Sequence, residues 1–256
     1  MKKNNFNLLF YFIKKDLKTR YAGSGLGLLW ILLIPVVQIM LFWFVFSGIM
    51  KARPYANTSM PYIYFLLSSF FFWLAFSEGV LRASSSIIEN AEMVKKISFP
   101  NILLPVTAIT SSYLLNLGGF LLFLFVYSLA TSFSPLFVLV IPVLLLQFLF
   151  SLGLGLLLAA LMPYLRDLSQ LLGYFIQGMF FVSPIIYSLE TIPERFKIIF
   201  FLNPLTYFVS SYHTILLFRK IPDLAFLGTI CLLSLGAITC GYFIFGKLRP
   251  GFADVL

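Results

Sequence analysis

The sequence has little charge, little histidine and little cysteine. Of its 256 residues, 11% are Asp, Glu, Lys or Arg, one is histidine and two are cysteine, whereas 61% are hydrophobic and 18% are aromatic. A soluble fold of this length cannot hide so much apolar surface from water. One histidine and two cysteines also lack the spacing of a metal site. The composition therefore predicts an integral membrane protein without a metal centre.

Long charge-free runs define the predicted membrane spans. A hydrocarbon core of about 30 Å requires roughly 20 apolar residues per helix. The run from 97 to 165 is too long for one helix, and the turn sequence at 131–135 divides it into two. We predict an all-α integral membrane protein, a single domain with six transmembrane helices at 26–50, 62–82, 103–130, 136–162, 168–188 and 224–246.

Residues 190–222 form the longest stretch between predicted spans, and this stretch is apolar but broken. The break at Asn203-Pro204 leaves a run of about 14 residues, which is short for a membrane crossing. We predict short re-entrant helices that form an outer gate before the last span, with Asn203, Pro204, Tyr207 and His213 as its residues. A seven-span alternative stays open, because it distributes the basic residues equally well.

The basic residues predict the orientation in the membrane. Cytoplasmic loops carry the excess of Lys and Arg, and in the six-span arrangement 12 of the 18 basic residues lie on the side of both termini. Phe6, Phe10, Ile13 and Leu17 share one face of a helix, so residues 5–20 are expected to form an amphipathic interface helix. The charged N-terminal residues lack the apolar core of a cleavable signal peptide. Both termini are expected in the cytoplasm.

A polar segment separates the second and third predicted spans. Glu89, Asn90 and Glu92 come first, Lys95 and Lys96 follow, and a proline ends the segment. Acids near the start and bases near the end of a helix suit its dipole, and Glu92 and Lys96 have the i, i+4 spacing of an ion pair. The segment predicts a short cytoplasmic helix at 87–97, longer than a simple chain reversal needs, that a partner protein grips.

Two local patterns refine this interpretation. Ser86 and Glu89 have the spacing of a capping box, which predicts that the cytoplasmic helix begins there. Glu78 and Arg82 lie four residues apart near the end of the second span, and we expect them to pair with each other at the level of the headgroups.

Five stretches, in this order, resemble the membrane (permease) subunit of the ABC exporters of polysaccharides. They are "LKTRYAGSGLGLLWILLIPV", "ENAEMVKKISFPNILLP", "LRDLSQLLGYFIQGMFFVSPIIY", "LNPLTYFVSSYHTILL" and the terminal "FADVL". Exporters of this kind move O-antigen, capsule or teichoic acid chains linked to lipid carriers. The resemblance extends over nearly the whole chain.

The resemblance implies partners and a mechanism. It implies a coupling helix at 87–97 that docks into a separate ATPase subunit, present in two copies, and a second copy of this chain, with a channel at the homodimer interface. It places gate helices at 192–217 and the protein in the bacterial plasma membrane. ATP and Mg²⁺ would be bound by the partner, and no cofactor by this chain. Many relatives have an arginine where this chain has His213, which puts a role for permanent charge there in doubt.

The residues agree that the chain is not itself an enzyme. Its nearest approach to a phosphate loop, "GYFIFGKL" at 241–248, lacks the Ser or Thr that binds magnesium and follows no strand. For an exporter we expect Arg20 and Arg166 to attract the pyrophosphate of the lipid-linked glycan. Aromatic side chains are expected to stack on sugars in the channel, namely Tyr62, Tyr64, Trp73 and Tyr174.

Two other classes of membrane protein remain as alternatives. An ion-coupled or passive transporter is expected to place charged residues at mid-membrane, and the predicted spans place none there. An intramembrane enzyme acting on lipid-linked sugars needs acid–base or metal chemistry, for which His213 has no nearby carboxylate pair. No basic tract suggests a nucleic-acid partner.

Overall fold

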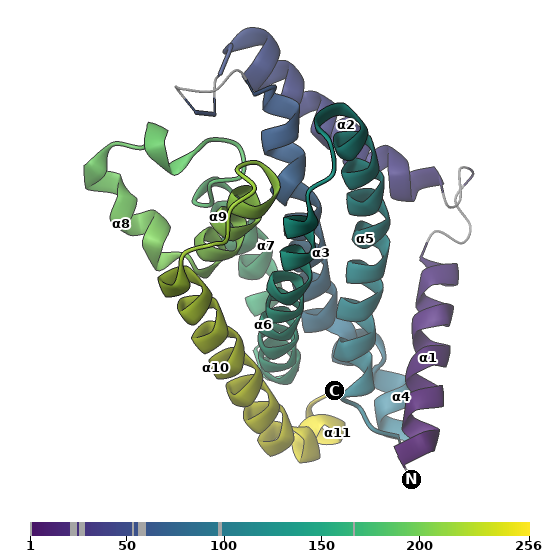
Figure 1. The fold of residues 1–256 in the computed structure, drawn as a ribbon. Coiled ribbons are helices and arrows are strands. Elements are labelled where there is room, and N and C mark those ends of the chain that lie inside the picture. Colours follow the sequence, from purple (N-terminus) through teal and green to yellow (C-terminus); the bar gives the residue numbers. More distant parts are fainter. Residues whose placement is uncertain are drawn as a thin grey trace.

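The computed structural model describes residues 2–20, 25, 29–52, 54–55, 60–96, 99–165 and 167–256, with side chains from residue 6 onward except those of residues 31 and 32. Every regular element in these ranges is helical (Figure 1). Within them, four helices are long and apolar enough to cross a membrane: Tyr62–Glu89, Leu103–Thr131, Pro135–Leu161 and Leu224–Val255. The described part of the chain is therefore all-helical, and its long apolar helices are those of a multi-pass membrane protein.

Helix α3 (Tyr62–Glu89) forms the centre of the bundle. It packs between α5 (Leu103–Thr131) and α6 (Val140–Leu161), which follows the short 3₁₀ helix η3 (Pro135–Leu139). Seven of its 17 buried residues are aromatic, and among them Phe65, Phe70 and Phe76 are fully buried. A helix that is apolar on nearly all sides is buried in a bundle, and α3 is the most enclosed of the four long helices.

Helix α10 (Leu224–Leu248) packs along α6, and glycines bring the two backbones together. A Cβ atom at Gly241 would lie 2.8 Å from the carbonyl carbon of Gly153 and closer still to its oxygen. A Cβ atom at Gly153 would overlap the backbone of Ala237 and Ile238. Small residues allow this close approach, which favours helix association where no water drives it.

Two of the predicted spans correspond to shorter helices. Residues 26–50 hold α2 (Trp30–Trp43), which continues as the π-helical η2 (Phe44–Ile49), while residues 26–28 lie outside the described residues. Residues 168–188 hold α7 (Leu168–Phe181), which ends seven residues before the predicted boundary. The chain then turns through a buried segment that includes Ile185 and Ile186.

The segment predicted as an outer gate folds into η4 (Leu189–Thr191), α8 (Glu194–Leu202) and α9 (Pro204–Leu216). Helix α9 packs against α3, α6 and α10, and its Phe208, Tyr212 and His213 are buried. Helix α8 keeps Ile198 and Leu202 exposed. Only part of this segment is therefore peripheral, because α9 belongs to the core of the bundle.

The opposite end of the bundle holds both termini together with α1 (Lys2–Thr19), α4 (Ala91–Lys96), η5 (Arg249–Gly251) and α11 (Phe252–Val255) (Figure 1). Helix α11 packs against α4, and an apolar cluster joins them to the ends of the long helices. Its buried members include Ile87, Val94, Phe245 and Phe252. The C-terminal residues therefore support the short helix that follows α3.

Candidate functional site

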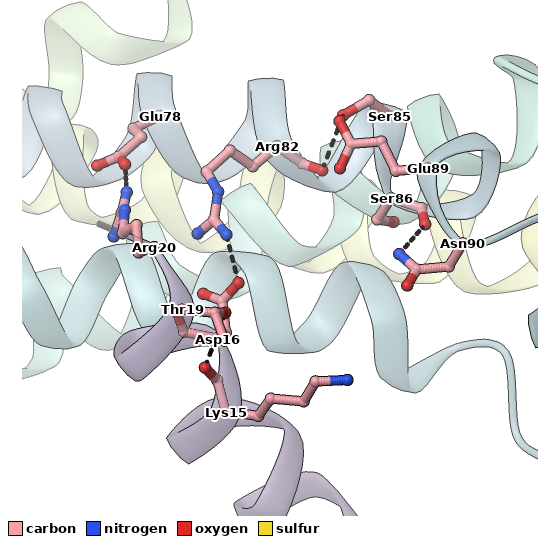
Figure 2. A network of polar contacts seen from close by, with 10 residues as sticks. All are labelled: Lys15, Asp16, Thr19, Arg20, Glu78, Arg82, Ser85, Ser86, Glu89 and Asn90. Atoms are coloured by element: carbon pink, nitrogen blue, oxygen red, sulfur yellow. Dashed lines mark hydrogen bonds and ion pairs between the residues drawn. The ribbon is translucent and has the colours of Figure 1, made fainter. Parts of the chain in front are cut away.

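A polar row on α3 leads from the bundle to α4 (Figure 2). Arg20 of α1's C-terminal end pairs with Glu78, and Asp16 of α1 pairs with Arg82. The Ser85 hydroxyl then donates to the Glu89 carboxylate at 2.5 Å. The prediction that Glu78 and Arg82 pair with each other is therefore wrong, because α1 supplies the opposite charge to each.

The helix predicted at 87–97 begins later than expected. Residues 87–89 belong to α3, and the break falls at Asn90, whose side-chain amide donates to the Ser86 carbonyl at 2.8 Å. Ser86 does not act as a capping residue, since its hydroxyl donates to the Ala83 carbonyl inside α3. Residue 97 lies outside the described residues. The Asn90 side chain thus satisfies one of the last carbonyls of α3 at the point where this helix ends.

Helix α4 presents its charges outward. Lys96 pairs with Glu92 one turn earlier, with side-chain exposures of 73% and 79%, and Lys95 is also exposed. Val94 is buried in the apolar cluster with α11. Such an arrangement fixes one face of α4 to the bundle and leaves the other free to contact a partner.

A polar cavity of about 180 Å³ lies between α1, α3, α4 and α5. Its lining includes Lys15, Asp16, Arg82, Glu89 and Asn90. A second cavity, of about 260 Å³, adjoins the Arg20–Glu78 pair and extends between α2, α3 and α5, where most of its lining is apolar. The polar cavity thus borders the Asp16–Arg82 pair, and the second cavity borders the Arg20–Glu78 pair.

The structure describes one of the two residues predicted to attract pyrophosphate. The guanidinium of Arg20 is engaged with Glu78, and its side chain is only 8% exposed. Arg166 lies outside the described residues. Arg20 therefore acts in this arrangement within an ion pair.

The four predicted channel aromatics do not gather in one place. Tyr62 is buried and donates its hydroxyl to the Ile186 carbonyl at 2.9 Å, while the Tyr64 ring lies 5.0 Å from that of Tyr127. Trp73 borders a groove of about 320 Å³ between α2, α3 and α7. Tyr174 is exposed on α7.

Asn203 connects the outer segment to the end of α7. Its side-chain amide donates to the carbonyls of Met179 and Val182 and, at 2.8 Å, to the Ser183 hydroxyl. Its side-chain oxygen accepts from the Leu205 backbone N–H at 3.0 Å and so caps α9, with Pro204 at the first helical position. One buried side chain thus fixes both where α9 begins and where it lies.

The other two predicted gate residues lie on α9. The Tyr207 hydroxyl donates to the Phe201 carbonyl at 2.9 Å, which connects α9 back to α8. The buried His213 ring lies 4.4 Å from the Phe65 ring, with Nε2 3.3 Å from the Ser69 hydroxyl. His213 therefore packs as a hydrogen-bonded group in the core.

Sequence reasoning missed two sets of polar residues. Asp16 received no role, although it pairs with Arg82. The buried Gln147 donates to the Phe72 carbonyl at 3.0 Å and accepts from the Tyr212 hydroxyl at 2.6 Å. An isolated glutamine in an apolar run was the available signal for Gln147, since a buried amide needs partners. In the described part of the chain, no group of three or more metal-ligating side chains is found.

Comparison with known proteins gives concordant matches. The family described as ABC-2 type transporter matches residues 7–217. An "O-antigen export system permease protein RfbA" of Klebsiella pneumoniae is 31% identical over 98% of this chain and 95% of its own length. A protein of the same name from Myxococcus xanthus is 30% identical over 96% of this chain and 94% of its own length.

Proposed function

The chain belongs to the ABC-2 type transporter family, and from this premise we propose that it is the transmembrane subunit of an ATP-driven polysaccharide exporter. Its substrate is a lipid-linked chain of the O-antigen, capsule or teichoic acid type, moved across the bacterial plasma membrane. The observation that carries this proposal is similarity over nearly the whole chain to relatives named as O-antigen export permeases.

The energy comes from a separate ATPase subunit, present in two copies, that binds ATP and Mg²⁺. Helix α4 supports this assignment, because its exposed Glu92, Lys95 and Lys96 offer a charged surface while Val94 anchors it. Glu89 and Asn90 complete the coupling surface at the junction with α3. A docking helix needs both an exposed surface and a fixed contact with the bundle, because a partner must reach the helix and its movement must be passed on to the rest of the protein.

Six spans fit the helices as follows. Besides the four long helices, α2 with η2 comprises residues 30–49, of which the 14 α-helical residues extend about 21 Å and the six π-helical residues lengthen the helix toward the roughly 30 Å of the hydrocarbon core. Helix α7 has 14 residues, about 21 Å, and the buried turn after it completes the crossing. Irregular backbone is tolerated at membrane depth where protein covers it. Both termini, α1 and α4 then face the cytoplasm.

The channel forms between two copies of the chain. Helices α2 and α7 carry large apolar side chains exposed to their surroundings, among them Met40, Leu41 and Phe175. The groove between these helices is bordered by Gln38, Trp73 and other side chains, which would face the channel once a second copy covers the apolar surface. Arg166 remains the candidate for the pyrophosphate, and α8 with α9 for the outer gate.

Two alternatives are less well supported. An ion-coupled transporter would use charged groups at mid-membrane, whereas the buried mid-span Gln147 is neutral and Glu78 lies near an end, paired with Arg20. An enzyme acting on lipid-linked sugars would need His213 as acid or base, but its ring is enclosed by the core.

Copurification tests the proposal directly. The chain would be expressed with the ATPase encoded beside it, and the complex would be assayed in lipid nanodiscs for ATP hydrolysis with and without lipid-linked oligosaccharide. We expect a stable complex whose hydrolysis rises with the glycan, and no hydrolysis when the ATPase carries an inactivating change in its phosphate loop. A chain that purifies without any ATPase, or a complex indifferent to the glycan, would refute the assignment.

Charge reversal on α4 tests the docking surface. Lys95→Glu with Lys96→Glu should weaken binding of the ATPase without unfolding the spans, because both side chains are exposed. Arg195→Glu with Lys197→Glu, on α8 at the opposite end of the bundle, is the matched change and should leave ATPase binding unaltered. Binding equal to wild type in the α4 variant would argue that the ATPase docks elsewhere.

A further inference from the structure

Four charged residues join α1 to α3 as two ion pairs. Asp16 and Arg20 are four residues apart near the end of α1, and Glu78 and Arg82 are four residues apart on α3. Arg20 pairs with Glu78, and Asp16 pairs with Arg82 (Figure 2). The two helices run in opposite directions (Figure 1), so the pairs form a ladder with two rungs.

The ladder defines one register between the helices. If α1 slid along α3 by one turn, about 5.4 Å, either Arg20 would meet Arg82 or Asp16 would meet Glu78. Like charges would then replace opposite charges. One-turn shifts are a known kind of switching motion between packed helices, and this charge pattern opposes them in both directions.

The ladder is partly shielded from solvent. The side chains of Arg20, Asp16, Arg82 and Glu78 are 8%, 23%, 30% and 36% exposed. Charges in such an environment are screened less by salt than fully exposed pairs, so their preference for this register should persist at physiological ionic strength. Helix α1 packs its backbone against α5 and reaches α3 through these long side chains.

The ladder is also continuous with the coupling helix. On α3 the polar row passes from Glu78 and Arg82 to Ser85 and Glu89, and α4 follows directly after Asn90. At its other end, Arg20 and Glu78 border the cavity that Pro35 and Gln38 of α2 also line. The four charges therefore lie between the element expected to dock the ATPase and the first span.

We propose that this ladder is a register lock that makes α1 follow α4 when the ATPase displaces it, and so passes the displacement to α2. The inference rests on the proposed function, because it requires a partner that moves α4. Asp16, Arg20, Glu78 and Arg82 are positioning residues in this scheme, since they act through the helices they join.

A charge swap tests the lock in the full complex of chain and ATPase in nanodiscs. Asp16→Arg and Arg82→Asp each place like charges opposite one another. The variant that swaps all four charges (Asp16→Arg, Arg20→Asp, Glu78→Arg and Arg82→Asp) restores opposite charges on both rungs and again brings like charges together after a slide of one turn. We expect each single variant to lose at least about tenfold in glycan-stimulated ATP hydrolysis and in export, with unstimulated hydrolysis retained. The variant with all four charges swapped should recover to within about threefold of wild type. Lys18→Asp, an equal charge change at an exposed position of α1, should stay within about twofold.

The outcomes separate the two proposals. A wild-type complex without glycan-stimulated hydrolysis refutes the proposed function. With an active wild type, single variants that match it, or a swap no better than the single variants, overturn the lock. Where single variants fail to assemble, Asp16→Glu and Arg82→Lys provide the test, because they retain charge and should keep coupling above that of the neutral Arg82→Gln. Equal coupling in Arg82→Lys and Arg82→Gln overturns the lock as well.

Discussion

Adding one methyl group at Gly241 should force α10 away from α6. A Cβ atom at this position would lie 2.8 Å from the carbonyl carbon of Gly153 and 3.1 Å from its Cα. Carbon atoms in contact prefer about 3.5–4.0 Å, so the helices must separate locally by roughly 1 Å. The obstacle is backbone, which cannot rotate aside as a side chain would, and the displacement spreads along the packed pair.

The cost can be set against the known gain of alanine in a helix. Overpacking of a tight interface typically costs about 1–3 kcal/mol, and replacing glycine by alanine in a helix returns about 1 kcal/mol. Gly236, on the same helix, has no atom within 4 Å of the position that a Cβ would occupy. Gly236→Ala should therefore gain the stability of alanine in a helix without any overpacking cost. The two variants should differ in unfolding free energy by about 1–3 kcal/mol, the overpacking cost itself.

Thermal unfolding in one detergent, followed by intrinsic fluorescence, measures this difference. At about 2–4 °C per kcal/mol for a chain of this size, Gly241→Ala should melt about 2–12 °C below Gly236→Ala. A Gly241→Ala protein that melts at or above the Gly236→Ala protein would show that the close approach of α6 and α10 does not contribute to stability.

Three further changes probe other contacts. Asn203→Asp keeps the cap of α9 but loses the amide donors to the carbonyls of Met179 and Val182. Because each unpaired buried group costs about 1–3 kcal/mol, trypsin should cleave residues 190–222 faster than in wild type. An unchanged cleavage rate would contradict this. Gln147→Leu removes the hydrogen-bond partner of both the buried Tyr212 hydroxyl and the Phe72 carbonyl. It should lower Tm more than Tyr212→Phe, which removes one hydrogen bond only. A larger decrease in Tm for Tyr212→Phe would refute the reasoning. Phe252→Ala empties a fully buried position beneath α4 at a cost of about 3–5 kcal/mol. ATPase binding should weaken, although the charged side chains of α4 are intact. Binding equal to wild type would argue that the C-terminal residues do not support α4.

The four long apolar helices cover stretches where hydrophobic length indicated spans, because lipid imposes one requirement on every spanning helix. The turn at 131–135 also lies where the sequence indicated, between α5 and η3. Asn203-Pro204 was interpreted as a break, and it is equally the start of α9, since asparagine caps and proline favours the first turn. What the sequence did not reveal is that α9 enters the core, because burial depends on neighbours that are distant along the chain.

Spacing along the sequence predicted the wrong ion-pair partners where the true partner lies on another helix. The i, i+4 rule joined Glu78 to Arg82, but both pair with α1. Nothing near Asp16 in the sequence marked it, since its partner is 66 residues away. The glycines present the same difficulty: Gly236 and Gly241 are five residues apart on α10, and only the position of α6 separates the open site from the crowded one.

The contrast between these two kinds of helix contact indicates which parts of the molecule can move. Helices α6 and α10 meet backbone to backbone at Gly153 and Gly241, and sliding one along the other would drive Cα atoms and side chains into that contact. Helix α1 meets α3 through long charged side chains beside a polar cavity, where side chains can follow a small displacement without losing their partners. A displacement of α4 would therefore pass through α3 to α1, while α6 and α10 keep their contact with each other. The ion pairs keep α1 in register with α3, and the glycine contact holds α6 and α10 together.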